Sequence, residues 1–205
     1  MRTQIRFPLF VSLVLFALLG VGCMKHEMDM NMKMDSPYMK IMMDMMTQMD
    51  AQVKTQDPDH DFAAQMVLHH DAAIKMAQEE LKSGTNSEMR TTAQTIITKQ
   101  QAEITQFNSF LNGHQPQQPT VPAFNQAQKT NMDKMMKDSE ARMLRNKADY
   151  DFAQLMIDHH QAAIDNSQAE LQYGRNNTTK TLAQNIIDDQ RMEIAALQNW
   201  LSRNN

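Results

Sequence analysis

Two adjacent histidine pairs, each with a methionine one helical turn earlier, have the clearest chemical potential in this chain. Met66 precedes His69 and His70, and Met156 precedes His159 and His160. On a helix, residues three and four positions apart share a face, so each sulfur stands beside both rings of its pair. Imidazole suits copper, and thioether sulfur is a soft donor that suits Cu(I), whereas carboxylate suits harder ions. The spacing therefore predicts soft-metal ligation by Met66, His69, His70, Met156, His159 and His160.

A second group of ligand residues is a string of methionines near the N-terminus. Residues 24–34 alternate methionine with charged or amide residues, in a chain with 21 methionines in all. No branched or aromatic residue in this string offers a core, so residues 23–38 are predicted to form a flexible tail. An open thioether string of this kind favours metal capture, and its predicted ligands are His26, Met28, Met30, Met32 and Met34.

The rest of the chain contains an internal duplication at a constant offset of 90 residues. Asp61-Phe62-Ala63 recurs as Asp151-Phe152-Ala153, and the histidine pairs recur in register with it. From position 61 to 111, 23 of 51 residues are identical to those found 90 positions later. This similarity indicates two structural copies that place the two histidine pairs equivalently.

Each copy is predicted to form two long helices. In the first copy, Asp57-Pro58 supplies a capping residue followed by a proline at the first helical position, and Gly84 is a helix stop. Apolar residues follow the 3.6-residue period from Phe62 to Leu81 and again from Ala93 to Leu111. Two such hairpins with similar apolar faces predict an all-α protein built around a four-helix bundle.

A shorter helix precedes each hairpin, and its methionines have helical spacing. They are expected to fill gaps in the core: Met39, Met42, Met43, Met46 and Met49 in the first copy, and Met132, Met135, Met136 and Met143 in the second. Prolines at 116, 119 and 122 predict a linker over 113–124. The predicted bundle, 39–205, therefore consists of the copies 39–112 and 125–205.

Residues 1–22 have the pattern of a secretion signal. Arg2 and Arg6 precede an apolar run that is too short and wrongly flanked for a spanning helix. The small residues before Cys23 resemble a bacterial lipoprotein signal, in which Cys23 is lipidated and becomes the mature N-terminus, although Gly20 departs from the usual leucine. The alternative is a plain secreted protein with a free thiol. In both cases we expect a protein outside the cytoplasm, in the periplasm or cell envelope, and in the first case a membrane anchor.

Composition excludes several other classes of protein. One cysteine cannot form a disulfide framework or a thiolate zinc site. With 20 Lys+Arg against 24 Asp+Glu and no basic run, nucleic acid is not an expected partner. The Glu-x-x-His motif of diiron bundles is absent from the sequence. Glutamates recur at equivalent positions in the two copies, Glu80, Glu103, Glu170 and Glu193, so a carboxylate metal site stays open as an alternative. Exposed helix faces are the simpler expectation for them.

The motif Asp61-Phe62-Ala63-x-x-Met66-x-x-His69-His70, followed by Ala93-x-x-Ile96-Ile97, resembles the bacterial family called domain of unknown function 305. The resemblance covers roughly residues 39–202 and implies a ferritin-like helical bundle in an exported protein. Some methionine-rich members are associated with periplasmic copper binding and copper resistance, and this tail is similar to theirs. The resemblance also adds Met76 to the predicted ligands. The second copy has Asn166 at that position, so its site is expected to be weaker or differently built.

These features predict a membrane-anchored protein that binds Cu(I), and Ag(I) by similar chemistry. The tail captures ions and the bundle holds them, buffering the metal or passing it to a copper export component, and no reaction is required. Two alternatives stay open. One is an oxidoreductase that uses a metal bound in the bundle, for instance for Cu(I) or iron oxidation. The other is a helical adaptor with a methionine partner surface, in which Gln100 and Gln190 satisfy structural histidines.

Overall fold

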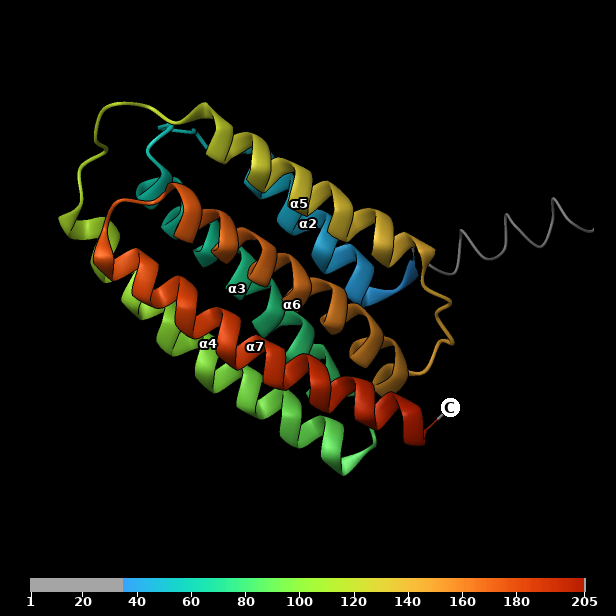
Figure 1. Cartoon of the computed structure of the whole chain (residues 1–205). Coiled ribbons are helices and arrows are strands. Elements are labelled where there is room, and N and C mark those ends of the chain that lie inside the picture. The colour runs from blue at the N-terminus through green and yellow to red at the C-terminus, as the bar shows by residue number, and fades with distance from the viewer. Residues whose placement is uncertain (1–34, 205) are drawn as a thin grey trace, which may run out of the picture.

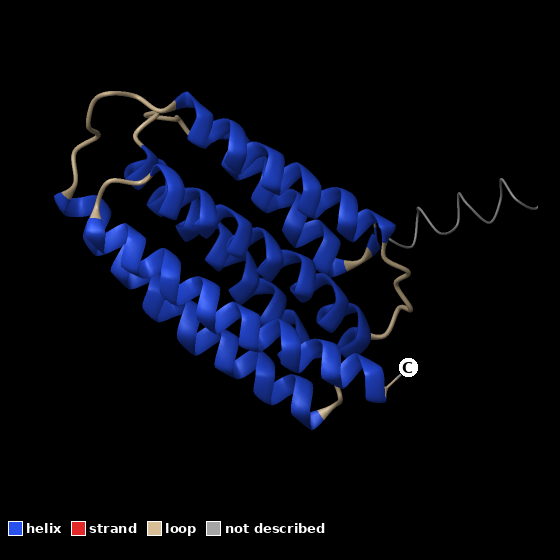
Figure 2. Ribbon diagram, in the orientation of Figure 1, coloured by secondary structure: helices blue, strands red, loops and turns tan. Residues whose placement is uncertain are grey.

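The computed structural model describes residues 35–204, which form six helices and contain no strand (Figure 2). The helices are α2 (Pro37–Ala51), α3 (Pro58–Ser83), α4 (Ser87–Gly113), α5 (Pro122–Ala141), α6 (Ala148–Tyr173) and α7 (Asn177–Arg203). The all-α prediction is therefore confirmed. The predicted signal segment, the lipidation site Cys23 and the N-terminal methionine string lie outside the described residues.

The six helices form three layers of two (Figure 1). Helices α3 and α6 form the middle layer, with α4 and α7 on one side and α2 and α5 on the other. Helix α3 packs most extensively on α4, and α6 on α7, so each long hairpin is a unit. The four long helices form the bundle, and the shorter α2 and α5 cover the outer face of the middle layer.

The duplication fixes the ends of the long helices. Helices α3 and α6 begin and end 90 residues apart, and so do α4 and α7. The turns before α3 and α6 each contain a non-glycine residue with positive φ, Gln56 at 62° and Asn146 at 56°, which are equivalent positions. As predicted, Asp57 caps α3, where its side chain accepts a hydrogen bond from the Asp59 backbone N–H.

Two helices begin earlier than the sequence predicts. Helix α2 begins at Pro37, inside the predicted tail, and α5 begins at Pro122, inside the predicted linker. Proline is tolerated in the first turn of a helix because the N–H it lacks has no partner within the helix there. Both prolines therefore start helices, and the connection between the copies shortens to residues 114–121.

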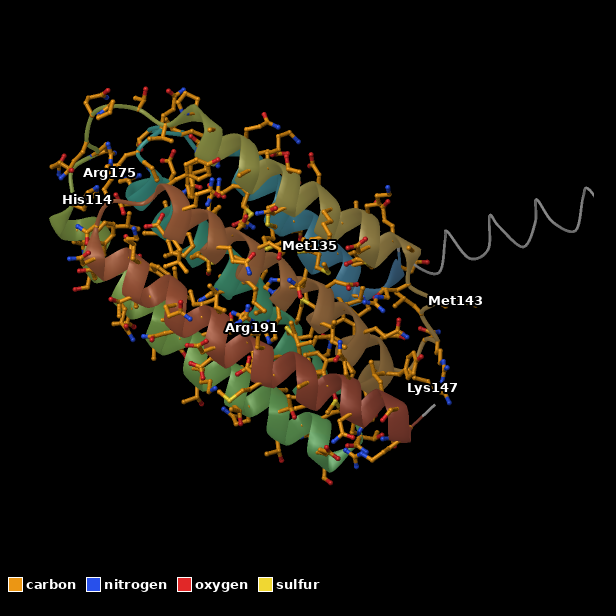
Figure 3. The ribbon with its side chains drawn as sticks, in the orientation of Figure 1. His114, Met135, Met143, Lys147, Arg175 and Arg191 are labelled. Atoms are coloured by element: carbon orange, nitrogen blue, oxygen red, sulfur yellow. The ribbon has the colours of Figure 1, made fainter. Side chains whose placement is uncertain are left out.

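Methionines of α2 and α5 fill much of the core, as expected. The fully buried members are Met39, Met42, Met45, Met49, Met132 and Met135. The expectation was wrong for Met143, whose side chain is 81% exposed because α5 ends at Ala141. Figure 3 shows Met135 within the helical layers and Met143 at the end of the molecule.

The expectation that Glu80 and Glu170 are exposed was also wrong, because both are fully buried near the C-terminal ends of α3 and α6. The carboxyl group of Glu80 accepts a hydrogen bond from the Tyr38 hydroxyl at 3.1 Å and lies within hydrogen-bond reach of Asp149. At the equivalent place in the other copy, Glu170 lies against Asp59. Two carboxylates have no proton to share, so each pair needs one protonated member.

The protonated member of each pair is the glutamate. Burial, assisted by the neighbouring aspartate, raises the pKa of Glu80 to about 8 and the pKa of Glu170 to about 9. Burial acts on Asp149 too, but hydrogen bonds from Glu80 and from two backbone N–H groups outweigh it and lower the pKa of Asp149. Each aspartate caps the interhelical loop of the opposite copy, so these carboxyl pairs join the two repeats at both ends of the bundle.

Glycines at 84 and 174 leave room for the buried carboxyl groups. A Cβ at Gly84 would overlap the Glu80 carboxyl and lie 2.7 Å from the Glu80 carbonyl oxygen, and Gly174 meets Glu170 in the same way. We expect Gly84→Ala to lower the free energy of unfolding by about 1–3 kcal/mol, because the glutamate must leave its partners. Urea unfolding measures this, with Gly113→Ala as control.

The control glycine ends α4, and a Cβ there meets no atom within 4 Å. A loss of stability at Gly113 equal to that at Gly84 would show that the helix end, and not the buried carboxyl, determines the effect. Among residues 35–204, no helix is long and apolar enough to cross a membrane.

Candidate metal centre

The four histidines of the two pairs lie in the centre of the bundle, and each is 0% exposed. His69 comes from α3 and His159 from α6, and their ring centroids are only 3.7 Å apart, with an angle of 40° between the rings. These residues are equivalent in the duplication, so the near-symmetric packing of α3 on α6 brings each one onto its counterpart. The sequence predicts the pairs, and the structure joins them into one histidine layer.

The second histidine of each pair points towards the outer hairpin helix. Nε2 of His70 lies 2.9 Å from Oε2 of Glu103 on α4, and Nε2 of His160 lies 2.9 Å from Oε2 of Glu193 on α7. Consecutive residues diverge by about 100° around a helix, which explains why one ring faces the centre and the other faces a seam. Both members of each pair are nevertheless fully buried.

Glu103 and Glu193 were expected on exposed faces, and this expectation was wrong. Their side chains are only 15% and 13% exposed, and both contact histidine. A signal for this was present in the sequence, because Gln100, Glu103 and Phe107 follow the i, i+3, i+7 spacing of one helix face. Since Gln100 and Phe107 are buried, the glutamate between them faces the bundle too.

The polar atoms of this layer are largely without hydrogen-bond partners. Among the described residues, neither nitrogen of any of the four rings makes a hydrogen bond of good geometry, and the 2.9 Å glutamate contacts are ion-pair distances only. The side-chain amides of Gln100 and Gln190 are buried and equally unpartnered. The alternative in which these glutamines satisfy the histidines is therefore not what the structure shows. Buried polar atoms in native proteins are rarely left unpaired, so this concentration marks a site.

The electrostatics keep the two central rings neutral. Burial, followed by the neighbouring histidines, lowers the pKa of His69 and of His159 well below the ordinary value of 6.5. A contact with the backbone of His69 opposes the shift at His159 only in part. Neutral imidazole is the form that ligates metals, so at neutral pH both rings are in the ligating state.

The two outer contacts differ in their surroundings. Burial would raise the pKa of Glu193, but His160 and Lys99 lower it, and the Lys99 Nζ lies 3.3 Å from Glu193 Oε1. Glu103 lines a surface cavity of about 310 Å³ between α4 and α7, together with Lys99, Asp188 and Asp189. Lys99, which also pairs with Asp189 at 2.9 Å, therefore contacts Glu193 directly and lines the cavity next to Glu103.

The predicted methionine ligands on the bundle helices, Met66, Met76 and Met156, are buried but do not form one cluster. Met66 packs with Phe62 and Phe107 in one apolar cluster, whereas Met76 and Met156 belong to the other. Among residues 35–204, no group of three or more His, Cys, Asp or Glu side chains is arranged to hold a metal ion.

The two copies differ where the second has Asn166 in place of Met76. The Asn166 side chain donates to Met132 Sδ at 3.3 Å and accepts from Asn131 Nδ2 at 3.0 Å. The thioether of the first copy is thus replaced by an amide that is engaged with α5.

Comparison with known proteins gives a consistent picture. The model of the family described as domain of unknown function (DUF305) matches residues 14–111 and again residues 109–201. A search of curated proteins finds no match.

Two solved structures are similar in fold. A DUF305 fragment from Deinococcus radiodurans is 24% identical, with a TM-score of 0.54, and the match covers 71% of this chain and 96% of the fragment. CopM in the Cu(I)-bound form is 22% identical, with a TM-score of 0.53, and the match covers 74% of this chain and 98% of CopM.

Proposed function

We propose that this chain, which belongs to the family called domain of unknown function 305, is a copper-binding protein that holds Cu(I) in its buried histidine layer. It acts outside the cytoplasm, where it buffers copper, contributes to copper resistance or delivers the metal to an export component. The same chemistry accepts Ag(I). The role is non-catalytic, because holding and releasing an ion requires no reaction.

One observation carries this proposal. Two neutral imidazoles, His69 and His159, meet at 3.7 Å in the protein centre with ring nitrogens that have no hydrogen-bond partner among the described residues. Leaving such groups unpaired is costly, and a ligated metal removes the cost. Imidazole and thioether donors without a carboxylate cluster favour copper over harder ions. The similarity of the fold to that of Cu(I)-bound CopM supports the same choice of metal.

The methionines and outer histidines complete the proposed ligand set. Met66, Met76 and Met156 are fully buried on α3 and α6, the two helices that carry the histidines. The imidazole rings of His70 and His160 provide further donors to the ion. Because a thioether has no proton to lose, a site that includes methionine keeps its donors at acid pH better than one made of histidine alone. In this proposal the second copy contributes less, since Asn166 replaces the thioether.

The N-terminal tail has a separate part in the proposal. His26, Met28, Met30, Met32 and Met34 form an open capture string, and Cys23 carries the lipid that anchors the chain to a membrane. The tail thus collects ions for the bundle.

The test is a titration of the mature protein with Cu(I) in the presence of a chromogenic Cu(I) chelator, without oxygen. We expect equimolar protein to withdraw copper from the chelator. Replacing Met28, Met30, Met32 and Met34 by serine is expected to lower the number of ions bound while the tightest binding persists. A chelator spectrum unchanged by equimolar protein would rule out the proposed function.

A further inference from the structure

A cavity of about 290 Å³ lies beside α2 and α5, on the opposite side of the middle layer from α4 and α7. Three methionines line it: Met46 and Met49 from α2, and Met132 from α5. We propose that this cavity is a second site for a soft monovalent metal ion, Cu(I) or Ag(I), separate from the histidine layer. The inference uses the metal of the proposed function but depends on different residues.

Buried amide groups are the first evidence that the cavity is a site. Gln128, on α5, is 1% exposed, and both polar atoms of its side chain are without hydrogen-bond partners among the described residues. Gln65, on α3, is 6% exposed, and its Oε1 is also unpartnered. Both residues line the cavity with the methionines. Such amide oxygens are available to an ion that enters the cavity.

The duplication provides an internal comparison for these amides. The positions equivalent to Gln65 and Gln128 in the other copy are Leu155 and Tyr38. Leu155 is fully buried in the apolar core, and Tyr38 packs there with its hydroxyl bonded to Glu80. The fold is therefore satisfied by apolar or fully bonded side chains at these positions. The unpartnered amides are a property of this cavity and are not required by the architecture.

The thioether set is duplicated only in part. Met46 corresponds to Met136 and Met132 corresponds to Met42, whereas Met49 corresponds to Ser139. Ser139 is buried and within hydrogen-bond distance of Asp158, so a polar contact replaces the thioether there. Gap filling by methionine therefore recurs at two of the three positions. Met49, together with the unpartnered amides, distinguishes this cavity from its counterpart in the other copy.

The charged groups at the rim leave the thioethers free to bind a cation. Lys54 donates to the Met49 carbonyl oxygen at 2.9 Å, and Lys129 pairs with Asp133 at 2.8 Å, so both ammonium groups have acceptors of their own. Asp50 also lines the cavity and offsets part of their positive charge. Met132 Sδ accepts from Asn166, which orients the sulfur and leaves it a second lone pair. The three thioethers are soft donors, which favour Cu(I) and Ag(I) over Mg²⁺ or Ca²⁺, and the uncharged amide oxygens are harder, additional donors.

The experiment uses the full mature chain, labelled with ¹³C at the methionine methyl groups and titrated with Ag(I), which is diamagnetic and stable in air. Single substitutions to leucine assign the methyl signals of Met46, Met49 and Met132. We expect these three signals to shift together with one Ag(I), and Met46→Leu/Met49→Leu/Met132→Leu to lower the stoichiometry by one ion per chain. The matched control, Met39→Leu/Met42→Leu/Met135→Leu, replaces buried methionines that do not line the cavity and is expected to keep the stoichiometry.

The outcomes separate this inference from the proposed function. If the methyl signals of Met66 and Met156, beside the histidine pairs, respond to Ag(I) but the three cavity methyl groups do not, the cavity is not a metal site and the proposed function stands. If neither set responds, both fail. Should the triple variant unfold, Met46→Leu decides the question, because Met46 is only partly buried and its loss leaves the fold intact. If Ag(I) shifts the Met49 and Met132 signals in Met46→Leu as much as it does in the parent protein, the inference is also overturned.

Discussion

Replacing both central histidines, as His69→Leu and His159→Leu, is expected to stabilise the metal-free protein while removing its tight copper binding. Both rings are fully buried and their nitrogens have no hydrogen-bond partner among the described residues. Leucine fills a similar volume without a polar atom, so we expect the free energy of unfolding to rise by about 1–3 kcal/mol for each ring. Copper affinity is expected to fall by more than roughly 100-fold. Removing two metal ligands should weaken binding more than removing residues that only orient the ligands, which costs about 10- to 100-fold.

Two measurements check this expectation: urea unfolding of the metal-free protein, and competition with a Cu(I) chelator. His114→Leu is the matched control. His114 is also buried, but its Nε2 is 2.8 Å from Asp57 Oδ2 and its ring stacks on Phe110, so its loss should destabilise the protein and leave copper affinity unchanged. A double variant that is destabilised like His114→Leu and still binds copper would contradict a metal role for the central histidines.

The second large effect is expected at the buried carboxyl pairs, where Glu80→Gln/Glu170→Gln should remove most of the loss of stability at alkaline pH. The pKa of Glu80 is raised to about 8 and that of Glu170 to about 9, against 4.5 for an ordinary glutamate, mainly because burial penalises the charged form. Between pH 4.5 and these raised pKa values, the folded protein binds more protons than the unfolded chain does. The free energy of unfolding therefore falls as pH rises, and the contribution is fully present only below about pH 4.5.

The effect of the two glutamates on stability is best measured above pH 6.5. Below pH 6.5 the lowered pKa values of His69 and His159 make the free energy of unfolding rise with pH, which opposes the effect of the glutamates. We expect the Tm of the metal-free protein to fall on the order of 10 °C between about pH 6.5 and about pH 9. Glutamine donates to Asp149 or Asp59 without a proton to lose, so the double variant should show a nearly flat profile. Calorimetry at several pH values measures this directly.

Glu79→Gln is the control for the carboxyl pairs. Glu79 is next to Glu80 on α3, but hydrogen bonds from Ser83 and Lys82 outweigh the effect of its partial burial and lower its pKa. Its replacement should leave the slope between about pH 6.5 and about pH 9 unchanged. A double variant at Glu80 and Glu170 with the same alkaline slope as the parent protein would show that these pairs do not carry the proton linkage.

Much of the fold was predictable because helix formation depends on local spacing. Asp57-Pro58 starts α3 and Gly84 ends it, as their capping chemistry requires. The offset of 90 residues places the ends of α6 and α7 once those of α3 and α4 are known. Met143 shows the limit of this reasoning, since its spacing continues the pattern of α5 beyond Ala141, where the helix has already ended.

The candidate site was predictable only in its residue types. The two histidine pairs, the methionine one turn before each and their equivalence follow from order along the chain. The contact of His69 with His159, the inward orientation of Glu103 and Glu193 and the burial of Glu80 and Glu170 arise from tertiary packing. Burial of a helix face depends on what covers it. That depends on the near-symmetric packing of one repeat against the other, which local spacing does not specify.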